Sequence, residues 1–421
     1  MQMIKFLETQ SKKIGNGFKI YDFLNQLVLV LIGTFIFFNP FPHTTAIKEI
    51  SYYFSLIIVL LLVVLKKNEF SFRTPLTPPF GLFVLWAFLS IFWALNVKNS
   101  IHDFYSHLIR YIIFYFILIN FINSKRRLVF LSWVVIISST VFSIGGLFYY
   151  YIKLGNPLSN RFAIGFQHIP TNFVGFVTLF AIILIFHHFI TDNHAYRRAF
   201  LAICFFALAF ATLLTQTRSS LIGLFLAGSL MLMNKKRNMF IFALILLIVI
   251  VATPLDKRFS FEKILHNERI PNYYITYEII KRYPIIGIGF GMETYGTDLD
   301  LKAYENKLPP EIKSIPAPIL NDPHNMLCSI AVRLGLVGLA LFLYIIFVFG
   351  KMCVKCIKGG KDAFIKSWGR CIGSAFVGFF IIGIFEPSFS HLQETVFFTI
   401  LSMITILWRL NERSTNCSET S

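Results

Sequence analysis

The sequence has little charge for its length. Only 14% of its 421 residues are Asp, Glu, Lys or Arg, whereas 56% are hydrophobic, and the mean hydropathy is +0.67. Soluble domains carry about 25% charged residues, so a soluble globular core is excluded. The composition predicts an all-α integral membrane protein, and its 49 Phe and 17 Tyr suit lipid-facing and interfacial positions.

Acidic residues are especially scarce. The chain has 21 Asp and Glu against 39 Lys and Arg, which gives a formal net charge of +18. The excess lies mostly in short segments between apolar runs, where Lys and Arg mark the cytoplasmic side of a membrane. The positive charge therefore reflects orientation, and nucleic-acid binding is not expected.

Cysteine is also sparse. Of six Cys, Cys353 and Cys356 form a CxxC at a basic helix end that is expected to be cytoplasmic. A zinc site needs four ligands and a structural disulfide needs an oxidising compartment, so neither is supported. We expect no metal and no cofactor. The first apolar run follows about twenty polar and basic residues without a small-residue cleavage site, so no cleavable signal peptide is expected.

Twelve apolar runs are long enough to cross a bilayer as helices, at 1.5 Å per residue and about 30 Å of hydrocarbon. The seventh and eighth are separated only by residues 216–218, and can form a tight hairpin or one broken helix. The predicted runs cover 23–39, 48–65, 79–95, 104–122, 128–150, 170–190, 199–215, 219–234, 239–253, 325–349, 370–386 and 394–409.

Basic residues alternate from one connection to the next and so predict the orientation. Both termini are expected in the cytoplasm, and one long loop faces the other side. The predicted organisation is helices 1–9 over 1–253, a loop domain over 254–324, helices 10–12 over 325–409 and a cytoplasmic tail over 410–421.

The long loop is expected to contain short helices. Apolar residues recur at helical spacing between Pro271 and Tyr283, and Pro284 stops the pattern, which predicts a helix on the membrane surface. Gly287, Gly289 and Gly291 then resemble a nucleotide loop, but no strand–loop–helix context surrounds them. We interpret them as a tight turn in which backbones approach closely.

Two arginines are candidates for holding an anion. Arg218 lies between two apolar helices at their outward end, among hydroxyl side chains, and ionisable groups at membrane depth are costly. Its guanidinium suits phosphate oxygens, although an interfacial arginine that reaches lipid headgroups is the alternative. Arg269 precedes the surface helix and could clamp a diphosphate together with Arg218, or be an ordinary loop arginine.

Other titratable residues lie near the outward ends of the predicted helices. His324, followed by Asn325, enters the tenth helix, where a neutral imidazole could take a proton from a hydroxyl or be purely structural. Glu386 closes the eleventh helix and could handle protons or pair with an arginine. His168 enters the sixth helix, where it could bind substrate or simply lie at the interface.

Three of these segments resemble motifs of the bacterial O-antigen ligase and polymerase superfamily. His324-Asn325 is followed, ten residues after the histidine, by Gly335. Residues 216–222, QTRSSLI, are similar to that family's arginine motif, although Ile222 stands where a leucine is usual. Arg269 ahead of an aromatic helix, and the continuation YPIIGIGFG over 283–291, resemble the second arginine motif.

The resemblance implies an O-antigen ligase at the periplasmic face of a bacterial inner membrane. Such an enzyme transfers a glycan from undecaprenyl diphosphate to a lipid A–core sugar hydroxyl, without nucleotide or metal. Arg218 and Arg269 would then stabilise the leaving diphosphate and His324 would act as base or hold the diphosphate, with inversion at the anomeric carbon. His168, Glu386 and Asn325 are expected to contribute to binding substrate among membrane lipids.

Other functions share parts of this outline. An O-antigen polymerase uses the same donor, and protein O-oligosaccharyltransferases are similar. We favour the ligase because one long loop ends directly in the histidine motif, whereas polymerases more often divide this surface between two loops. A secondary transporter would instead predict inverted repeats and charged or interrupted helices at mid-membrane.

Overall fold

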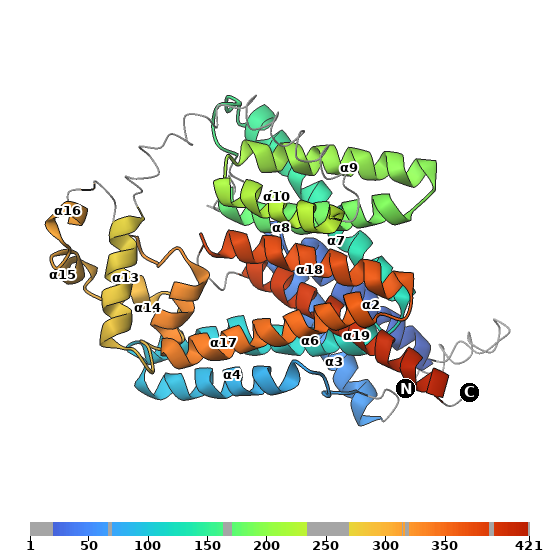
Figure 1. The fold of residues 1–421 in the computed structure, drawn as a ribbon, viewed down its shortest axis with the longest axis horizontal. Helices are drawn as coiled ribbons and strands as arrows, with labels where there is room; N and C mark the ends of the chain where they lie inside the picture. The colour runs from blue at the N-terminus through green and yellow to red at the C-terminus, as the bar shows by residue number, and fades with distance from the viewer. Residues whose placement is uncertain are drawn as a thin grey trace.

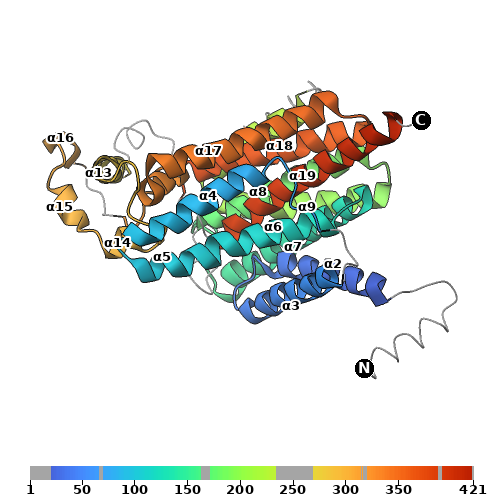
Figure 2. The same cartoon turned by 90° about the horizontal axis from the view of Figure 1, so that it is seen from below.

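A computed structural model describes residues 20–65, 70–162, 171–233, 269–313, 315, 320–386 and 391–419. Figures 1 and 2 show an elongated bundle in which most helices run along one axis. The helices are α2 (Ile20–Phe38), α3 (Thr45–Val64), α4 (Thr77–Ser90), η1 (Ile91–Trp93), α5 (Val97–Asp103), η2 (Phe104–Ile109), α6 (Arg110–Phe121), α7 (Lys125–Leu147), η3 (Phe148–Lys153), α8 (Thr171–Thr191), α9 (Ala195–Leu214), α10 (Arg218–Leu232), α13 (Ile270–Arg282), α14 (Thr294–Thr297), α15 (Leu301–Glu305), α16 (Pro310–Lys313), α17 (Met326–Gly359), α18 (Ala363–Gly383) and α19 (His391–Glu419).

The described helices confirm the all-α polytopic class. Within the described ranges, nine helices are long and apolar enough to cross a membrane, and two shorter apolar helices are Thr77–Trp93 and Arg218–Leu232. Together they correspond to eleven of the twelve predicted runs. The remaining run, 239–253, lies outside the described residues.

The helices with the largest buried fraction form the centre of the bundle. In the most apolar stretch of α8 and of α19, 78% and 83% of the residues are buried, against 28% in α9. α18 packs against α8, α10, α17 and α19. Apolar side chains on outer helices stay exposed, such as Ile57 on α3 and Phe206 on α9. Such faces suit contact with lipid.

Small residues let α8, α10 and α18 approach closely. A Cβ atom added to Gly223 of α10 would lie 2.9 Å from the carbonyl oxygen of Gly378 on α18. One added to Gly175 of α8 would lie 2.0 Å from Oγ of Ser220 and 3.7 Å from Cδ1 of Ile382. Close backbone packing through glycine is typical of membrane helices. It brings the first turn of α10 beside the last turn of α18.

The two ends of the bundle differ in charge. At the end we call the basic end, Lys125 pairs with Asp362, Lys355 lies 2.7 Å from Glu412, and Arg409 donates to the carbonyl of Ser71. The C-terminal end of α19 lies toward this end in Figure 1, and α13 to α16 lie at the opposite end, which we call the lobe end. This arrangement agrees with the alternation of basic segments, and the orientation across a membrane stays a prediction.

The lobe is a small unit with its own apolar core. α13 runs crosswise to the bundle, so the predicted surface helix forms with nearly the expected bounds (Figures 1 and 2). Its buried face is formed by Asn272, Ile275, Thr276 and Ile279, whereas Tyr277 is exposed. The buried core of the lobe consists of Ile275, Ile279, Ile288, Tyr295, Leu301, Tyr304, Leu308 and Val332.

A break in α17 joins this lobe to the bundle. Gly335 has φ 68° and ψ −174°, a conformation outside the helical region. The carbonyls of Val332 and Arg333 accept hydrogen bonds from the backbone N–H groups of Ile288 and Gly289, at 2.9 and 3.0 Å. Trp86 Nε1 donates to the Leu334 carbonyl at 2.8 Å. Backbone carbonyls that would accept hydrogen bonds within an unbroken helix therefore accept them from segment 284–291 and from α4.

The glycines of segment 284–291 allow this close approach. Gly287 has φ 69° and Gly289 has φ 103°, which side chains disfavour. A Cβ at Gly287 would lie 2.3 Å from the Arg333 carbonyl oxygen, and one at Gly335 would lie 1.9 Å from that of Ile285. The interpretation of the glycine-rich segment as a tight turn with close backbone contact is confirmed.

We expect Gly335→Ala to destabilise the attachment of the lobe. The positive φ alone costs about 1–3 kcal/mol for a residue with a side chain, and the clash with Ile285 adds to this cost. Thermal unfolding and limited proteolysis of segment 284–291 in detergent should both show the loss. Gly350→Ala is the matched control on the same helix, because nothing lies within 4 Å of its added Cβ. Equal stability of the two variants would contradict the prediction.

Candidate functional site

Arg269 links the lobe to the end of α18. It immediately precedes α13, and Pro271 lies in that helix's first turn. Its Nη1 donates to the carbonyl of Phe385 at 2.8 Å, and its Nη2 lies 3.9 Å from Oε1 of Glu386. The Glu386 side chain is only 3% exposed, whereas that of Arg269 is 27% exposed. The structure therefore brings together two residues singled out from the sequence.

His324 occupies a turn that α17 and its neighbours hold in place. Its φ of 47° is a left-handed conformation, uncommon for a residue with a side chain. Oδ1 of Asp322 accepts the His324 backbone N–H at 2.7 Å, and Asn272 Nδ2 donates to the Asp322 carbonyl. Asn325 caps α17, because its Oδ1 accepts from the N–H groups of Leu327 and Cys328 at 2.9 and 3.1 Å. The strained turn sets the position of the imidazole.

The surroundings of His324 favour its neutral form. Burial is the main cause that lowers the pKa of His324 from its ordinary value, and the nearby positive charge of Arg269 lowers it further. Asp322, whose Oδ2 lies 3.6 Å from Nε2, acts in the opposite direction. Nδ1 is buried without a hydrogen-bond partner among the described residues. At neutral pH the ring is therefore unprotonated and can accept a proton.

Arg218 reaches the same end of the molecule through helix packing. It is the first residue of α10 and is partly buried. Ser220, two residues later, lies beside Gly175, which also lies beside Ile382 in the last turn of α18. The chain reverses before α10 at Gln216, which has φ 51°, so the seventh and eighth predicted runs are two separate helices.

The structure brings some of the predicted site residues together and leaves others apart. Arg269, Glu386 and His324 are near neighbours by hydrogen bond, ion pair or electrostatic interaction. Arg218 lies at the same end, on a different helix. His168 lies outside the described residues.

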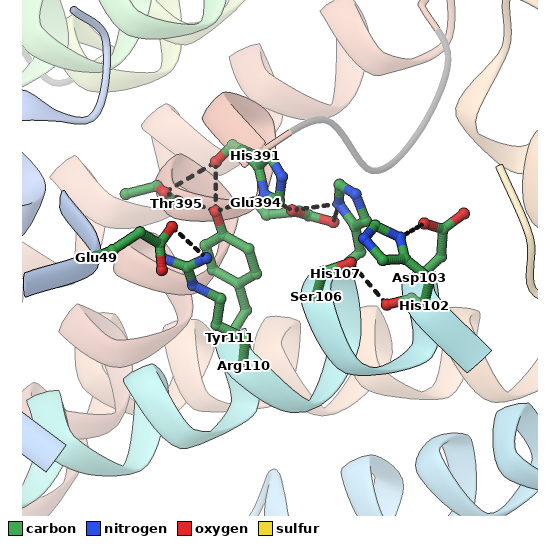
Figure 3. A network of polar contacts seen from close by, with 10 residues as sticks. All are labelled: Glu49, His102, Asp103, Ser106, His107, Arg110, Tyr111, His391, Glu394 and Thr395. Carbon is green, nitrogen blue, oxygen red and sulfur yellow. Dashed lines mark hydrogen bonds and ion pairs between the residues drawn. The ribbon is translucent and has the colours of Figure 1, made fainter. Parts of the chain in front are cut away.

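Sequence reasoning missed a polar network inside the lobe end (Figure 3). Nδ1 of His107 lies 2.9 and 3.0 Å from the two carboxylate oxygens of Glu394, and His391 Nδ1 lies 3.6 Å from the same group. Asp103 accepts a hydrogen bond from the backbone N–H of Met292 at 2.7 Å. A π-helical turn, η2, carries His107, and such turns are frequent at functional sites.

Arg333 is a deeply buried charge of this region. Only 3% of the residue is exposed, and Nε and Nη1 have no hydrogen-bond partner among the described residues. Its charge interacts with the carboxylates of Asp322, Asp103 and Glu394. An arginine inside the apolar run 325–349 was the available sequence signal, because charge at membrane depth is costly.

The network does not have a good geometry for a metal ion. His107, His391 and Glu394 place three ligand atoms within 4.8 Å of one another. However, the two imidazoles stack with centroids 4.2 Å apart and planes inclined by only 15°. Nitrogen lone pairs lie in the ring planes, so those of parallel rings are poorly placed to meet at one ion. The arrangement favours sharing of protons between histidine and carboxylate.

Comparisons with known proteins point to one family. Residues 202–343 match the family described as O-Antigen ligase. This segment includes Arg218, Arg269, His324 and Gly335, so the resemblance inferred from the motifs is confirmed. The chain is also similar to a Rickettsia typhi protein named "Putative polysaccharide ligase", with 24% identity over 374 residues that cover 79% of this chain and 85% of the relative.

The charges around His324 lead to a testable pH dependence. Diethyl pyrocarbonate reacts with the neutral form of a histidine ring and not with the protonated form. The extent of His324 modification is measured at each pH by peptide mass spectrometry, and the midpoint of this curve reports the pKa of His324. We expect a midpoint below the ordinary 6.5 or so. Arg269→Gln should raise the midpoint because a neighbouring cation is lost, and Asp322→Asn should lower it.

Lys281→Gln is the control for this measurement, because it removes a cation from the far end of α13. The midpoint of this variant should equal that of the protein without a substitution. A midpoint above 6.5, or a decrease in Arg269→Gln, would show that the described surroundings of His324 are wrong.

Proposed function

Because residues 202–343 match the O-Antigen ligase family, we propose that the protein is an O-antigen ligase. It transfers O-antigen glycan from undecaprenyl diphosphate to a sugar hydroxyl of the lipid A–core. The observation that carries this proposal is the placement of Arg269 near a half-buried His324, whose pKa is lowered, at the lobe end. A cation for the leaving group and a base for the acceptor are the two requirements of this reaction.

The arginines act on the donor. Breaking the bond between sugar and diphosphate places negative charge on a phosphate oxygen, and guanidinium donors stabilise that charge most when they are held in advance. Arg269 is held by the Phe385 carbonyl and Glu386, at the start of a helix whose N-terminal N–H groups also favour anions. Arg218 supplies the second guanidinium from the first turn of α10.

His324 acts on the acceptor. Its neutral imidazole takes the proton of the sugar hydroxyl as that oxygen attacks the anomeric carbon. Attack on the face opposite the diphosphate inverts this carbon, and the steps described require no metal. A role of His324 in binding the diphosphate, with positioning as the main contribution to rate, is the alternative for this residue. Asn325 keeps His324 in place by capping α17.

Both substrates are anchored in lipid, so they approach sideways from the bilayer. We place the reaction at the periplasmic face of the inner membrane, with both termini cytoplasmic, because the lobe lies opposite the basic end. Glu386, beyond the end of α18, would then contact the glycan or diphosphate. The predicted binding role of His168 concerns a residue outside the described ranges.

Reconstitution distinguishes this function from its competitors. Purified protein in vesicles would receive undecaprenyl-linked glycan and lipid A–core, with chelator present. A ladder of glycans on the core identifies a ligase, whereas longer undecaprenyl-linked chains identify a polymerase. Transport across sealed vesicles without glycan transfer would identify a transporter and end the proposal.

Substitutions at Arg218, Arg269 and His324 should strongly slow transfer without removing the protein from the membrane. We expect Arg218→Ala and Arg269→Ala each to slow transfer about 10²–10³-fold, and His324→Ala to slow it about 10²–10⁴-fold. Arg282→Gln is the matched control, since it removes an arginine from the opposite end of α13. If the His324→Ala or Arg218→Ala variant still attached a normal amount of O-antigen to the lipid A–core, the site assignment would be ruled out.

A further inference from the structure

A cavity lies at the basic end, at the opposite end of the bundle from the proposed chemistry. It has a volume of about 630 Å³ and opens between the start of α7, the α8–α9 connection and the start of α18. Its lining includes Val129, His187, Asn193, Arg197, Phe364 and Trp368. The proposed transfer reaction uses none of these residues.

The inner wall of the cavity carries an unsatisfied polar group. His187 is 1% exposed, and its Nδ1 has no hydrogen-bond partner among the described residues. Its ring packs on Trp368 with centroids 4.2 Å apart. The neighbouring His188, by contrast, has a partner, since its Nε2 lies 2.7 Å from Ser132 Oγ. Buried polar atoms usually have a partner, so the Nδ1 atom of His187 marks an unsatisfied polar point in the wall of the cavity.

The region around the cavity is strongly basic, and of its charged residues Arg197 and Asp192 line the cavity itself. Segments 125–127, 192–198 and 361–370, which border it, contain eight Lys or Arg and two Asp. Both carboxylates already have partners, because Asp192 lies 3.2 Å from Arg197 and Asp362 pairs with Lys125. The side chain of Arg197 is 63% exposed and so can reach a bound group. The cavity therefore attracts anions.

We propose that this cavity binds the phosphate group of an anionic phospholipid headgroup. Its depth fits, because His187, Val129 and Arg197 lie near the ends of candidate membrane-spanning helices, while Asn193 lies in the connection between α8 and α9. Basic pockets between membrane helices on the cytoplasmic side are known to accept such headgroups. The aromatic wall of Trp368 and Phe364 covers the glycerol part, and Arg197 pairs with the phosphate.

Native mass spectrometry of the detergent-purified full chain tests the proposal. The protein is incubated with phosphatidylglycerol or phosphatidylcholine of identical acyl chains, and bound lipids are counted. We expect one phosphatidylglycerol to be retained in preference to phosphatidylcholine. Arg197→Gln should reduce this occupancy about tenfold, whereas Arg126→Gln should not, because Arg126 carries the same charge at the same end but does not line the cavity.

Two further experiments test whether the phosphate belongs to a lipid or to a soluble compound, and whether His187 contributes to binding. Competition by inorganic phosphate at millimolar concentration would assign the site to a soluble phosphate compound and overturn the lipid headgroup. His187→Phe keeps an aromatic ring and removes the nitrogens, so weaker lipid retention in a variant with normal thermal unfolding supports the polar contact. Equal retention of both lipids, or equal losses in Arg197→Gln and Arg126→Gln, would overturn the proposal.

Discussion

The architecture of the lobe end depends on one break in one helix. Gly335 takes a conformation that interrupts α17, and the carbonyls of Val332, Arg333 and Leu334 then bind Ile288, Gly289 and Trp86. In a membrane, backbone groups without partners cost several kcal/mol each. The break is therefore stable only because the lobe and α4 satisfy the groups that it releases. The same contacts fix the lobe over the bundle.

This attachment sets the chemistry of the site. α13 is held on the broken helix, so Arg269 at its start reaches the end of α18, and Asn272 holds the turn that contains Asp322. His324 follows in a strained conformation between a carboxylate and a guanidinium. Strain of this kind is common at functional sites, where surrounding structure compensates for it. Partial burial and the nearby guanidinium of Arg269 lower the pKa of the imidazole and so favour its neutral form.

The molecule separates its charges into two regions with different physical roles. At the lobe end, buried groups such as Arg333 and Glu394 lie among apolar helices, where each charge must be compensated nearby. At the basic end, exposed Lys and Arg border an open cavity and remain available to anions of the membrane surface. The bundle thus has compensated buried charges at one end and exposed basic residues at the other.

Sequence alone determined the membrane class, eleven of the described helices and the surface helix of the lobe. These features could be predicted because hydrophobic length and charge alternation are local properties. The roles predicted for Arg218, Arg269, Glu386 and His324 stay predictions. Contacts between distant segments could not be predicted in this way. Only the tertiary structure decided that α17 breaks at Gly335, that Met292 binds Asp103, and that His107 pairs with Glu394. Those pairings join segments up to 287 residues apart, and no spacing rule reports them.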